Sequence, residues 1–167
     1  MNHLVISCIG PDRTGIVDSL STIISRHNGN WQVSSLHHLS GYFAGVIEVA
    51  VEVKNTQALT DDLNNIVGLN CQIELAESNL AQVTSNLVLE LTANDRAGIV
   101  QEISSVIHHQ GGNLIKLVSS QTSAPHTGQL MFMATVQVAM KDENLDDLIS
   151  ALEHIADDLM VDITKSS

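Results

Sequence analysis

The sequence is poor in basic residues. Its 167 residues include 7 Lys and Arg against 19 Asp and Glu, which gives a formal net charge of −12. A protein that binds a phosphate backbone neutralises it with Lys and Arg, and an anionic membrane surface attracts clusters of the same residues. The charge balance therefore argues against direct nucleic-acid binding and excludes a polybasic membrane patch.

Aromatic residues, cysteines and long apolar runs are also scarce. The four aromatic residues offer no platform on which single-stranded bases could stack; they are Trp31, Tyr42, Phe43 and Phe132. No segment reaches the roughly 18 consecutive apolar residues of a membrane span, and the first residues do not resemble a signal peptide. Cys8 and Cys71 are too few for a disulfide framework. We expect a cytoplasmic protein with reduced thiols.

The eight histidines do not form a metal-binding motif. His37 and His38 are neighbours on a predicted strand and point to opposite faces, and His108 and His109 lack the i, i+4 spacing that brings two ligands together on a helix. No HExxH or CxxC motif is present. We therefore expect no metal, no cofactor and no catalytic site, although His37 and His38 could make an interface sensitive to pH.

The strongest pattern in the chain is an internal repeat. At an offset of 83 residues, residues 4–30 align with residues 87–113 with 11 identities in 27 positions. Further along, the matches Val51-Glu52-Val53 over Val136-Gln137-Val138 and Asp61-Asp62-Leu63 over Asp146-Asp147-Leu148 predict an offset of 85. The second copy would then carry two extra residues, which we place in the turn at residues 124–128. Two copies of one small domain account for the length.

Hydrophobic periodicity predicts the same element order in both copies. In the first copy we expect strands at 3–10, 31–39, 43–54 and 71–76, one helix that begins after Gly15 and ends at a left-handed Gly29, and a second helix at 57–67. In the second copy we expect strands at 85–93, 113–122, 129–140 and 159–164 and helices at 98–110 and 143–157.

This order predicts an α+β protein with two tandem ferredoxin-like βαββαβ sandwiches, each with an antiparallel four-stranded sheet and both helices on one face. The expected boundaries are 1–78 for domain 1, 79–84 for the linker and 85–167 for domain 2. Each sheet has a second face without helices, which can pair with the other copy or with a second chain as a homodimer. Cys8 and Cys71 would lie on neighbouring strands, as buried and unreactive thiols.

The turn between the first strand and the first helix recurs in both copies. It reads Gly10-Pro11-Asp12-Arg13-Thr14-Gly15-Ile16-Val17 in the first and Ala93-Asn94-Asp95-Arg96-Ala97-Gly98-Ile99-Val100 in the second. Asp12 and Asp95 could cap the helices, with the two glycines allowing helix and sheet to approach closely. Alternatively, the free N–H groups of the helix could bind a carboxylate while the aspartate holds an α-amino group. Both interpretations remain open here.

The D-R-x-G-I-V turn in a βαββαβ unit resembles the ACT domain, and the resemblance extends over both copies. Together with Asn113-Leu114 and Leu117-Val118-Ser119, the turn is also similar to the glycine cleavage system transcriptional repressors. That resemblance implies a non-enzymatic regulator, without a DNA-binding domain, that responds to a small amino acid (glycine) and binds a partner transcription activator. It assigns ligand contacts to Asp12, Arg13, Thr14, Gly15, Ile16 and Asn30, and to Asp95, Arg96, Ala97, Gly98, Ile99 and Asn113.

The two turns differ in sequence, and the sequence is compatible with more than one function. Pro11 and Thr14 are replaced by Asn94 and Ala97 in the second turn, so the two sites need not bind equally well. Arg13 and Arg96 could instead bridge to carboxylates across the domain pair. Two other functions remain compatible with the sequence: a constitutive protein-interaction module, and a direct regulatory subunit of a metabolic enzyme.

Overall fold

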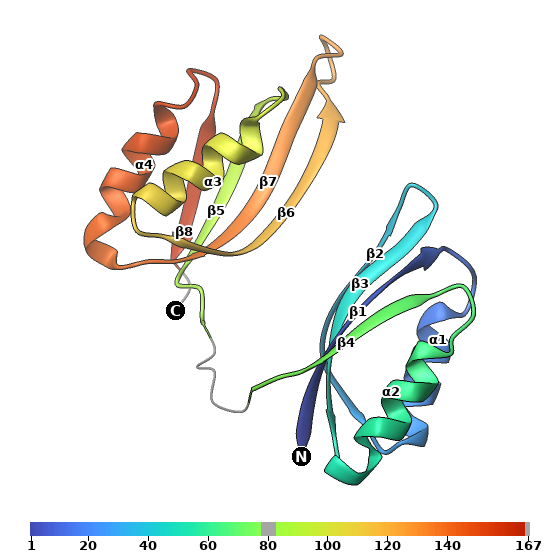
Figure 1. Ribbon diagram of the computed structural model, residues 1–167. Coiled ribbons are helices and arrows are strands. Elements are labelled where there is room, and N and C mark those ends of the chain that lie inside the picture. Colours follow the sequence, from blue (N-terminus) through green and yellow to red (C-terminus); the bar gives the residue numbers. More distant parts are fainter. Residues whose placement is uncertain (78–82, 166–167) are drawn as a thin grey trace. The chain divides into compact units, whose positions relative to one another are not determined.

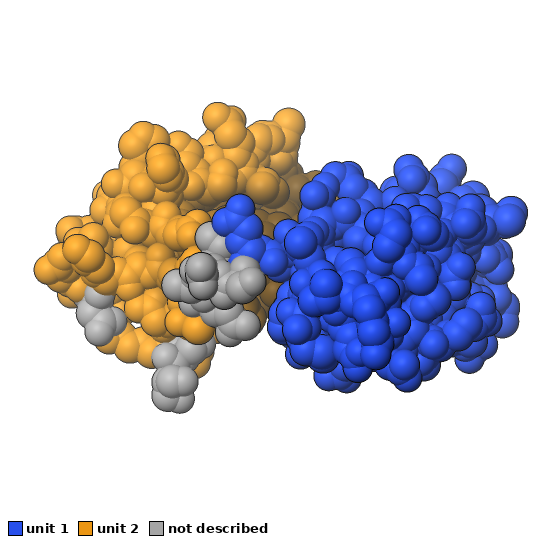
Figure 2. Space-filling view, turned by 60° about the horizontal axis from the view of Figure 1, so that its bottom comes forward, with its two compact units in different colours: residues 1–80 blue, residues 81–167 orange. Residues whose placement is uncertain are grey.

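A computed structural model describes residues 1–77 and 83–165. The chain divides into two compact units, residues 1–80 and residues 81–167 (Figures 1 and 2). Each unit has its own hydrophobic core and is described by itself. Residues 79–82 of the predicted linker lie outside the described residues, and residues 83–84 belong to no helix or strand. No helix within the described residues has the length and apolar character needed to cross a membrane.

Unit 1 is a four-stranded antiparallel sheet with two helices on one face (Figure 1). Its strands lie in the order β2-β3-β1-β4. In chain order the elements are β1 (Asn2–Pro11), α1 (Ile16–Arg26), β2 (Asn30–Leu39), β3 (Tyr42–Val51), the short 3₁₀ helix η1 (Val53–Asn55), α2 (Thr56–Asn64) and β4 (Asn70–Leu75).

Unit 2 repeats this architecture, with the strand order β6-β7-β5-β8. Its elements are β5 (Leu87–Asn94), α3 (Ile99–His109), β6 (Asn113–Ser123), β7 (Leu130–Ala139), η2 (Asp142–Asn144), α4 (Leu145–Glu153) and β8 (Met160–Lys165). The predicted α+β fold of two βαββαβ units with antiparallel sheets is therefore confirmed.

The core of each unit lies between the sheet and its two helices. In β1, Leu4, Ile6 and Cys8 are buried and alternate with exposed residues, so that one face of the strand packs under the helices. The helices contribute fully buried residues at helical spacing, such as Leu59 and Leu63 of α2. Burying a Leu or Ile side chain contributes about 1.5–3 kcal/mol, so these stripes hold the helices on the sheet.

The strand pairing corrects the predicted offset of the second half of the repeat. Ile6 lies opposite Ile47, and the repeat equivalent Leu89 lies opposite Val136. Since Leu89 is 83 residues after Ile6 and Val136 is 89 residues after Ile47, the offset on β7 is 89 rather than 85. The second copy thus carries six extra residues rather than two. They lie where they were expected, in the hairpin between β6 and β7.

Two local expectations are also wrong. The left-handed residue after α1 is Asn28 (φ 55°) rather than Gly29. Glycine is needed at position 29 for another reason: a Cβ there would lie only 2.9 Å from Ile24 Cγ2. Helices α2 and α4 end at Asn64 and Glu153, earlier than predicted. Ile66 and Ile155 continue the apolar stripe beyond the helix ends and still pack against the cores.

Candidate functional site

The two repeated turns have the same backbone conformation. Gly15 precedes α1 with φ 87° and ψ 10°, and Gly98 precedes α3 with φ 86° and ψ −2°. A Cβ at either glycine would meet nothing within 4 Å, so the glycines are needed for their left-handed conformation and not for close packing of helix and sheet. The backbone N–H of Asp12 donates to Gly41 O, and that of Asp95 to Leu130 O, both at 2.9 Å. The backbones of Arg13 and Arg96 therefore have equivalent positions in the two units.

The aspartates of the turns do not cap the helices, which corrects the capping interpretation. Neither α1 nor α3 has a side-chain cap, because Gly15 and Gly98 occupy the N-cap position. Asp12 Oδ2 instead lies 2.5 Å from His38 Nδ1, on β2. Asp95 Oδ2 accepts a hydrogen bond from Gln121 Nε2, on β6.

His38 and Gln121 are again equivalent, since each follows its aspartate by 26 residues. These two residues were not predicted as part of the site. The sequence signal that could have found them is the repeat. The offset of 83 that aligns Asp12 with Asp95 also aligns His38 with Gln121 on the next strand. The aspartates are thus held against β2 and β6, and their second carboxylate oxygen forms no hydrogen bond within the described residues.

The two arginines differ in the charge that surrounds them. Arg96 Nη1 lies 2.9 Å from Glu102 Oε1 and Nη2 lies 2.5 Å from Oε2, which is a bidentate ion pair within unit 2. This hydrogen-bonded carboxylate raises the pKa of Arg96. Arg13 Nη2 donates to the neutral carbonyl of Val67 at 3.2 Å. Each of these contacts lies within one unit, and the bridge to a carboxylate across the domain pair stays a prediction.

Arg13 is left without a carboxylate because of one change between the copies. The position of Glu102 is taken in unit 1 by Ser19, which makes the same backbone contact, N–H to Gly15 O, that Glu102 makes to Gly98 O. Among the described residues, no carboxylate lies within 4 Å of the Arg13 guanidinium. Unit 1 therefore offers an exposed, uncompensated cation at the start of α1, and unit 2 does not.

The other predicted site residues fall into three groups. Thr14 and Ala97 are exposed within the turns, and Ile16 and Ile99 are buried and anchor the first helical turn in the core. Asn30 lies at the opposite end of the sheet: it pairs with Ala50, which also faces His3. At about 3.3 Å per residue, His3 is roughly 26 Å from Pro11 along β1. Asn113 has the equivalent place opposite Ala139, so neither asparagine reaches the turn of its own unit.

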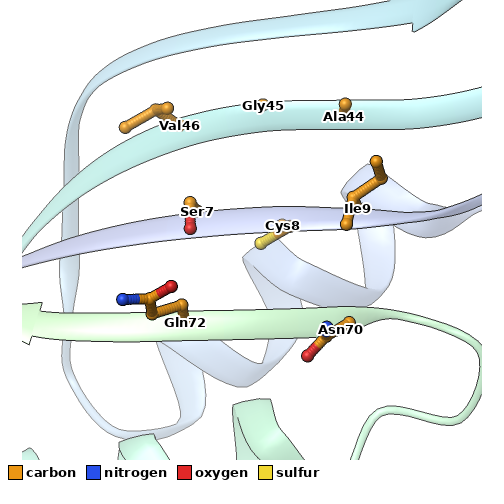
Figure 3. Close-up of a pocket in the computed structure, with 8 residues that line it drawn as sticks. All are labelled: Ser7, Cys8, Ile9, Ala44, Gly45, Val46, Asn70 and Gln72. Atoms are coloured by element: carbon orange, nitrogen blue, oxygen red, sulfur yellow. The ribbon is translucent and has the colours of Figure 1, made fainter.

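A shallow hollow lies on the helix-free face of the first sheet (Figure 3). Its lining is neutral: Ser7, Ile9, Ala44, Val46, Asn70 and Gln72 surround it, together with Cys8 and Gly45. The corresponding surface of unit 2 is acidic, because Glu90 and Asp162 replace Ser7 and Gln72. Glu90 and Asp162 lie directly opposite each other on β5 and β8. No residue of the turns lines either hollow.

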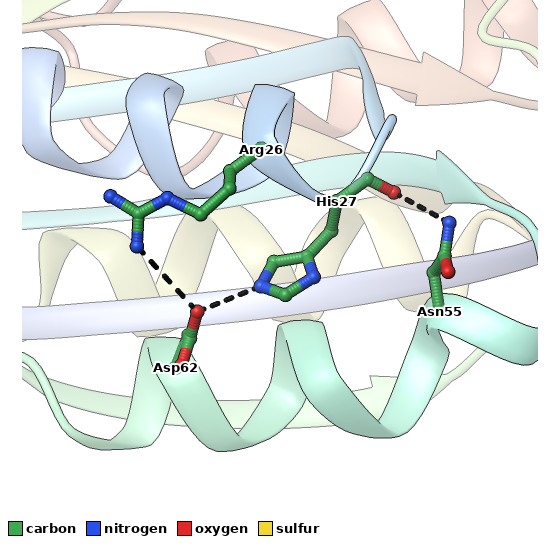
Figure 4. Close-up of polar contacts among 4 residues, drawn as sticks. All are labelled: Arg26, His27, Asn55 and Asp62. Atoms are coloured by element: carbon green, nitrogen blue, oxygen red, sulfur yellow. Dashed lines mark hydrogen bonds and ion pairs between the residues drawn. The ribbon is translucent and has the colours of Figure 1, made fainter.

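A polar cluster joins the two helices of unit 1 (Figure 4). His27 Nε2 lies 2.7 Å from Asp62 Oδ2, and Asn55 Nδ2 donates to His27 O at 3.0 Å. Arg26 Nη1 lies 3.9 Å from the same carboxylate oxygen. In unit 2 the contact of Asn144 Nδ2 with Gln110 O is kept, at 3.4 Å. The equivalent of Asp62 is Ala151, at the offset of 89.

The fold and the turns define the class of structure, and comparison with known proteins agrees with it. The ACT domain family matches residues 2–73, which is nearly all of unit 1. Unit 2, with the same element order and the same turn, is a second ACT-like unit. No curated protein sequence matches the chain.

Two crystal structures share the whole two-unit fold. A protein of unknown function from Galdieria sulphuraria is 24% identical, with a TM-score of 0.84 and coverage of 99% of both chains. A protein described as a candidate glycine cleavage system transcriptional repressor is 17% identical, with a TM-score of 0.73. That match covers 99% of this chain and 98% of the other. At these identities the comparisons establish the fold.

Proposed function

We propose that this chain is a non-enzymatic regulatory protein that binds a small amino acid, glycine in the first instance, at the turn of unit 1. The observation that carries this proposal is the uncompensated Arg13 at the start of α1, beside Asp12. A free amino acid is a zwitterion. Its carboxylate would be held by Arg13 and by the unpaired N–H groups of the first turn of α1. Asp12 would hold the ammonium group.

The turn of unit 2 is a weaker candidate for the same ligand. Glu102 already occupies the guanidinium of Arg96 with two hydrogen bonds. A ligand carboxylate would have to displace Glu102 or bind beside it, against its negative charge. Asp95, Gly98 and Ile99 remain in place there, so we propose unequal sites rather than a single one.

We propose that binding of the amino acid at the turn would act through a second ACT-like unit. Asn30 cannot reach the turn of its own unit, so it can contact the ligand only if another ACT-like unit brings it there. A ligand held by two bodies favours the arrangement that closes around it. It shifts the population only by its difference in affinity between the two arrangements.

The partner that we propose is a transcription activator rather than DNA. The net charge of −12 opposes a phosphate backbone and suits a basic protein surface. The acidic pair Glu90 and Asp162 on the open face of unit 2 is a suitable contact for such a surface. The protein described as a candidate glycine cleavage system transcriptional repressor shares the fold, and its description supports a role in transcription control without naming a partner.

A thermal-shift titration of the purified chain against single amino acids tests the proposal, with glycine and serine first. A ligand at 100 times its Kd stabilises the native state by about 2.7 kcal/mol, which is a rise of several degrees in Tm for a chain of this size. We expect a saturable rise with one small amino acid. No shift with any amino acid would favour the constitutive interaction module. Co-purification with a metabolic enzyme rather than a DNA-binding protein would favour the regulatory subunit.

A further inference from the structure

The two cysteines of the chain form a contact pair in unit 1. Cys8 of β1 lies directly opposite Cys71 of β4, and their Sγ atoms are 3.3 Å apart. Cys8 is buried with the core residues of the sheet, and Cys71 is partly exposed beside it. Both side chains are on the helix-covered face. Gln72, the next residue along β4, lines the hollow on the other face (Figure 3).

The fold does not need thiols at these positions. In unit 2 the same cross-strand pair is Leu91 opposite Val161, two apolar side chains that fill the same place in the core. Packing therefore explains an apolar pair here, and leaves unexplained why unit 1 has two thiols in contact.

We infer that Cys8 and Cys71 are an oxidation site, at which a peroxide converts the two thiols into a cross-strand disulfide. Directly opposed residues of antiparallel strands have Cα atoms about 4.5 or 5.5 Å apart, and both values fall within the range that a disulfide spans. The sulfur atoms need to approach by about 1.3 Å to reach bonding distance. This inference does not depend on the proposed amino-acid site.

Cys71 is the sulfur that reacts first. It is the more exposed of the two, and a thiolate at Cys71 accepts a hydrogen bond from the Cys8 thiol, which lowers the pKa of Cys71. The same hydrogen bond raises the pKa of Cys8, and the burial of Cys8 raises it further. The Cys71 thiolate attacks one oxygen of hydrogen peroxide, the O–O bond breaks, and the departing hydroxide takes up a proton to become water.

The second step closes the disulfide. The Cys8 sulfur attacks the sulfenic sulfur of Cys71, the S–O bond breaks, and the hydroxide that leaves takes the proton of Cys8 as water. Overall, two thiols and one hydrogen peroxide give one disulfide and two waters. The two sulfur atoms lose two electrons, and the peroxide gains them. A dithiol reductant reverses the reaction by thiol–disulfide exchange.

The test is oxidation of the reduced full-length chain with one equivalent of hydrogen peroxide, followed by thiol titration and intact mass. The matched control combines Cys71→Ser with Gln72→Cys, which moves the second thiol by one residue to the opposite face of the sheet. In denaturant the two chains have nearly the same loop length and should oxidise alike, so any difference in the native state reports the folded geometry.

We expect the native wild-type monomer to lose both thiols together and two hydrogen atoms in mass, at least tenfold faster than the shifted control, with full recovery in dithiothreitol. Equal rates in wild type and control would overturn the inference. So would intermolecular dimers, or addition of oxygen to Cys71 with Cys8 left as a free thiol.

Discussion

Replacing Gly15 by alanine isolates the cost of the left-handed turn residue. A Cβ at Gly15 would contact nothing within 4 Å, so the substitution neither fills a cavity nor creates a clash. What remains is the backbone strain of an L-residue at φ 87°, about 1–2 kcal/mol. The loss of conformational freedom in the unfolded chain offsets part of it. We expect Gly15→Ala to lower the free energy of unfolding of unit 1 by about 1 kcal/mol.

Trp31 makes this cost measurable for one unit at a time. It is the only tryptophan of the chain, and it packs against the core of unit 1. Its fluorescence during urea unfolding therefore follows unit 1, while circular dichroism follows both units. With a urea dependence of about 1–3 kcal/mol/M, a loss of about 1 kcal/mol moves the Trp31 midpoint by roughly 0.3–1 M.

Two further variants complete the test. Gly15→Asn should cost less than Gly15→Ala, because asparagine tolerates the left-handed region. Gly98→Ala should cost the same as Gly15→Ala in circular dichroism and leave the Trp31 midpoint unchanged, since its φ of 86° and its open surroundings are the same. An unchanged or higher midpoint for Gly15→Ala, or a larger cost for asparagine than for alanine, would refute the reasoning.

Two other predictions concern charges on the units. Asp62→Ala should destabilise unit 1 by about 0.5–1 kcal/mol, because it removes the hydrogen-bond partner of the half-buried His27; an unchanged Trp31 midpoint in urea would contradict this. Asp162→Asn should stabilise unit 2 by a few tenths of a kcal/mol, because it relieves the like charge of Glu90 directly opposite. Thermal unfolding of Asp162→Asn beside the control Glu74→Gln measures this stabilisation. A lower Tm for Asp162→Asn than for the control would contradict the prediction.

Periodicity explains why the element order could be predicted while the second half of the repeat could not be aligned. The true offset of 89 and the predicted offset of 85 differ by four residues. Four residues preserve the alternation of a strand and come close to one turn of a helix. The match of Val51 to Val136 and that of Leu63 to Leu148 therefore kept every side chain on its correct face while misplacing it along the chain.

The candidate site could be predicted only for residues that are close together in the sequence. The repeat placed Arg13 and Arg96 in equivalent turns, and the backbone confirms that equivalence. The contact of Asp12 with His38 depends on the β2–β3 hairpin folding back to the turn, which no local pattern states. Likewise, the difference in charge between the turns depends on Glu102, a residue of the following helix.

We propose that unit 1 carries the better amino-acid site because its arginine is uncompensated. Calorimetric titration of glycine into wild type, Arg13→Gln and Arg96→Gln tests it most directly, with Trp31 fluorescence confirming that each variant is folded. We expect saturable binding of glycine in wild type, a loss of at least tenfold in affinity in Arg13→Gln, and little change in Arg96→Gln. Equal losses in both variants, or unchanged affinity in Arg13→Gln, would contradict it.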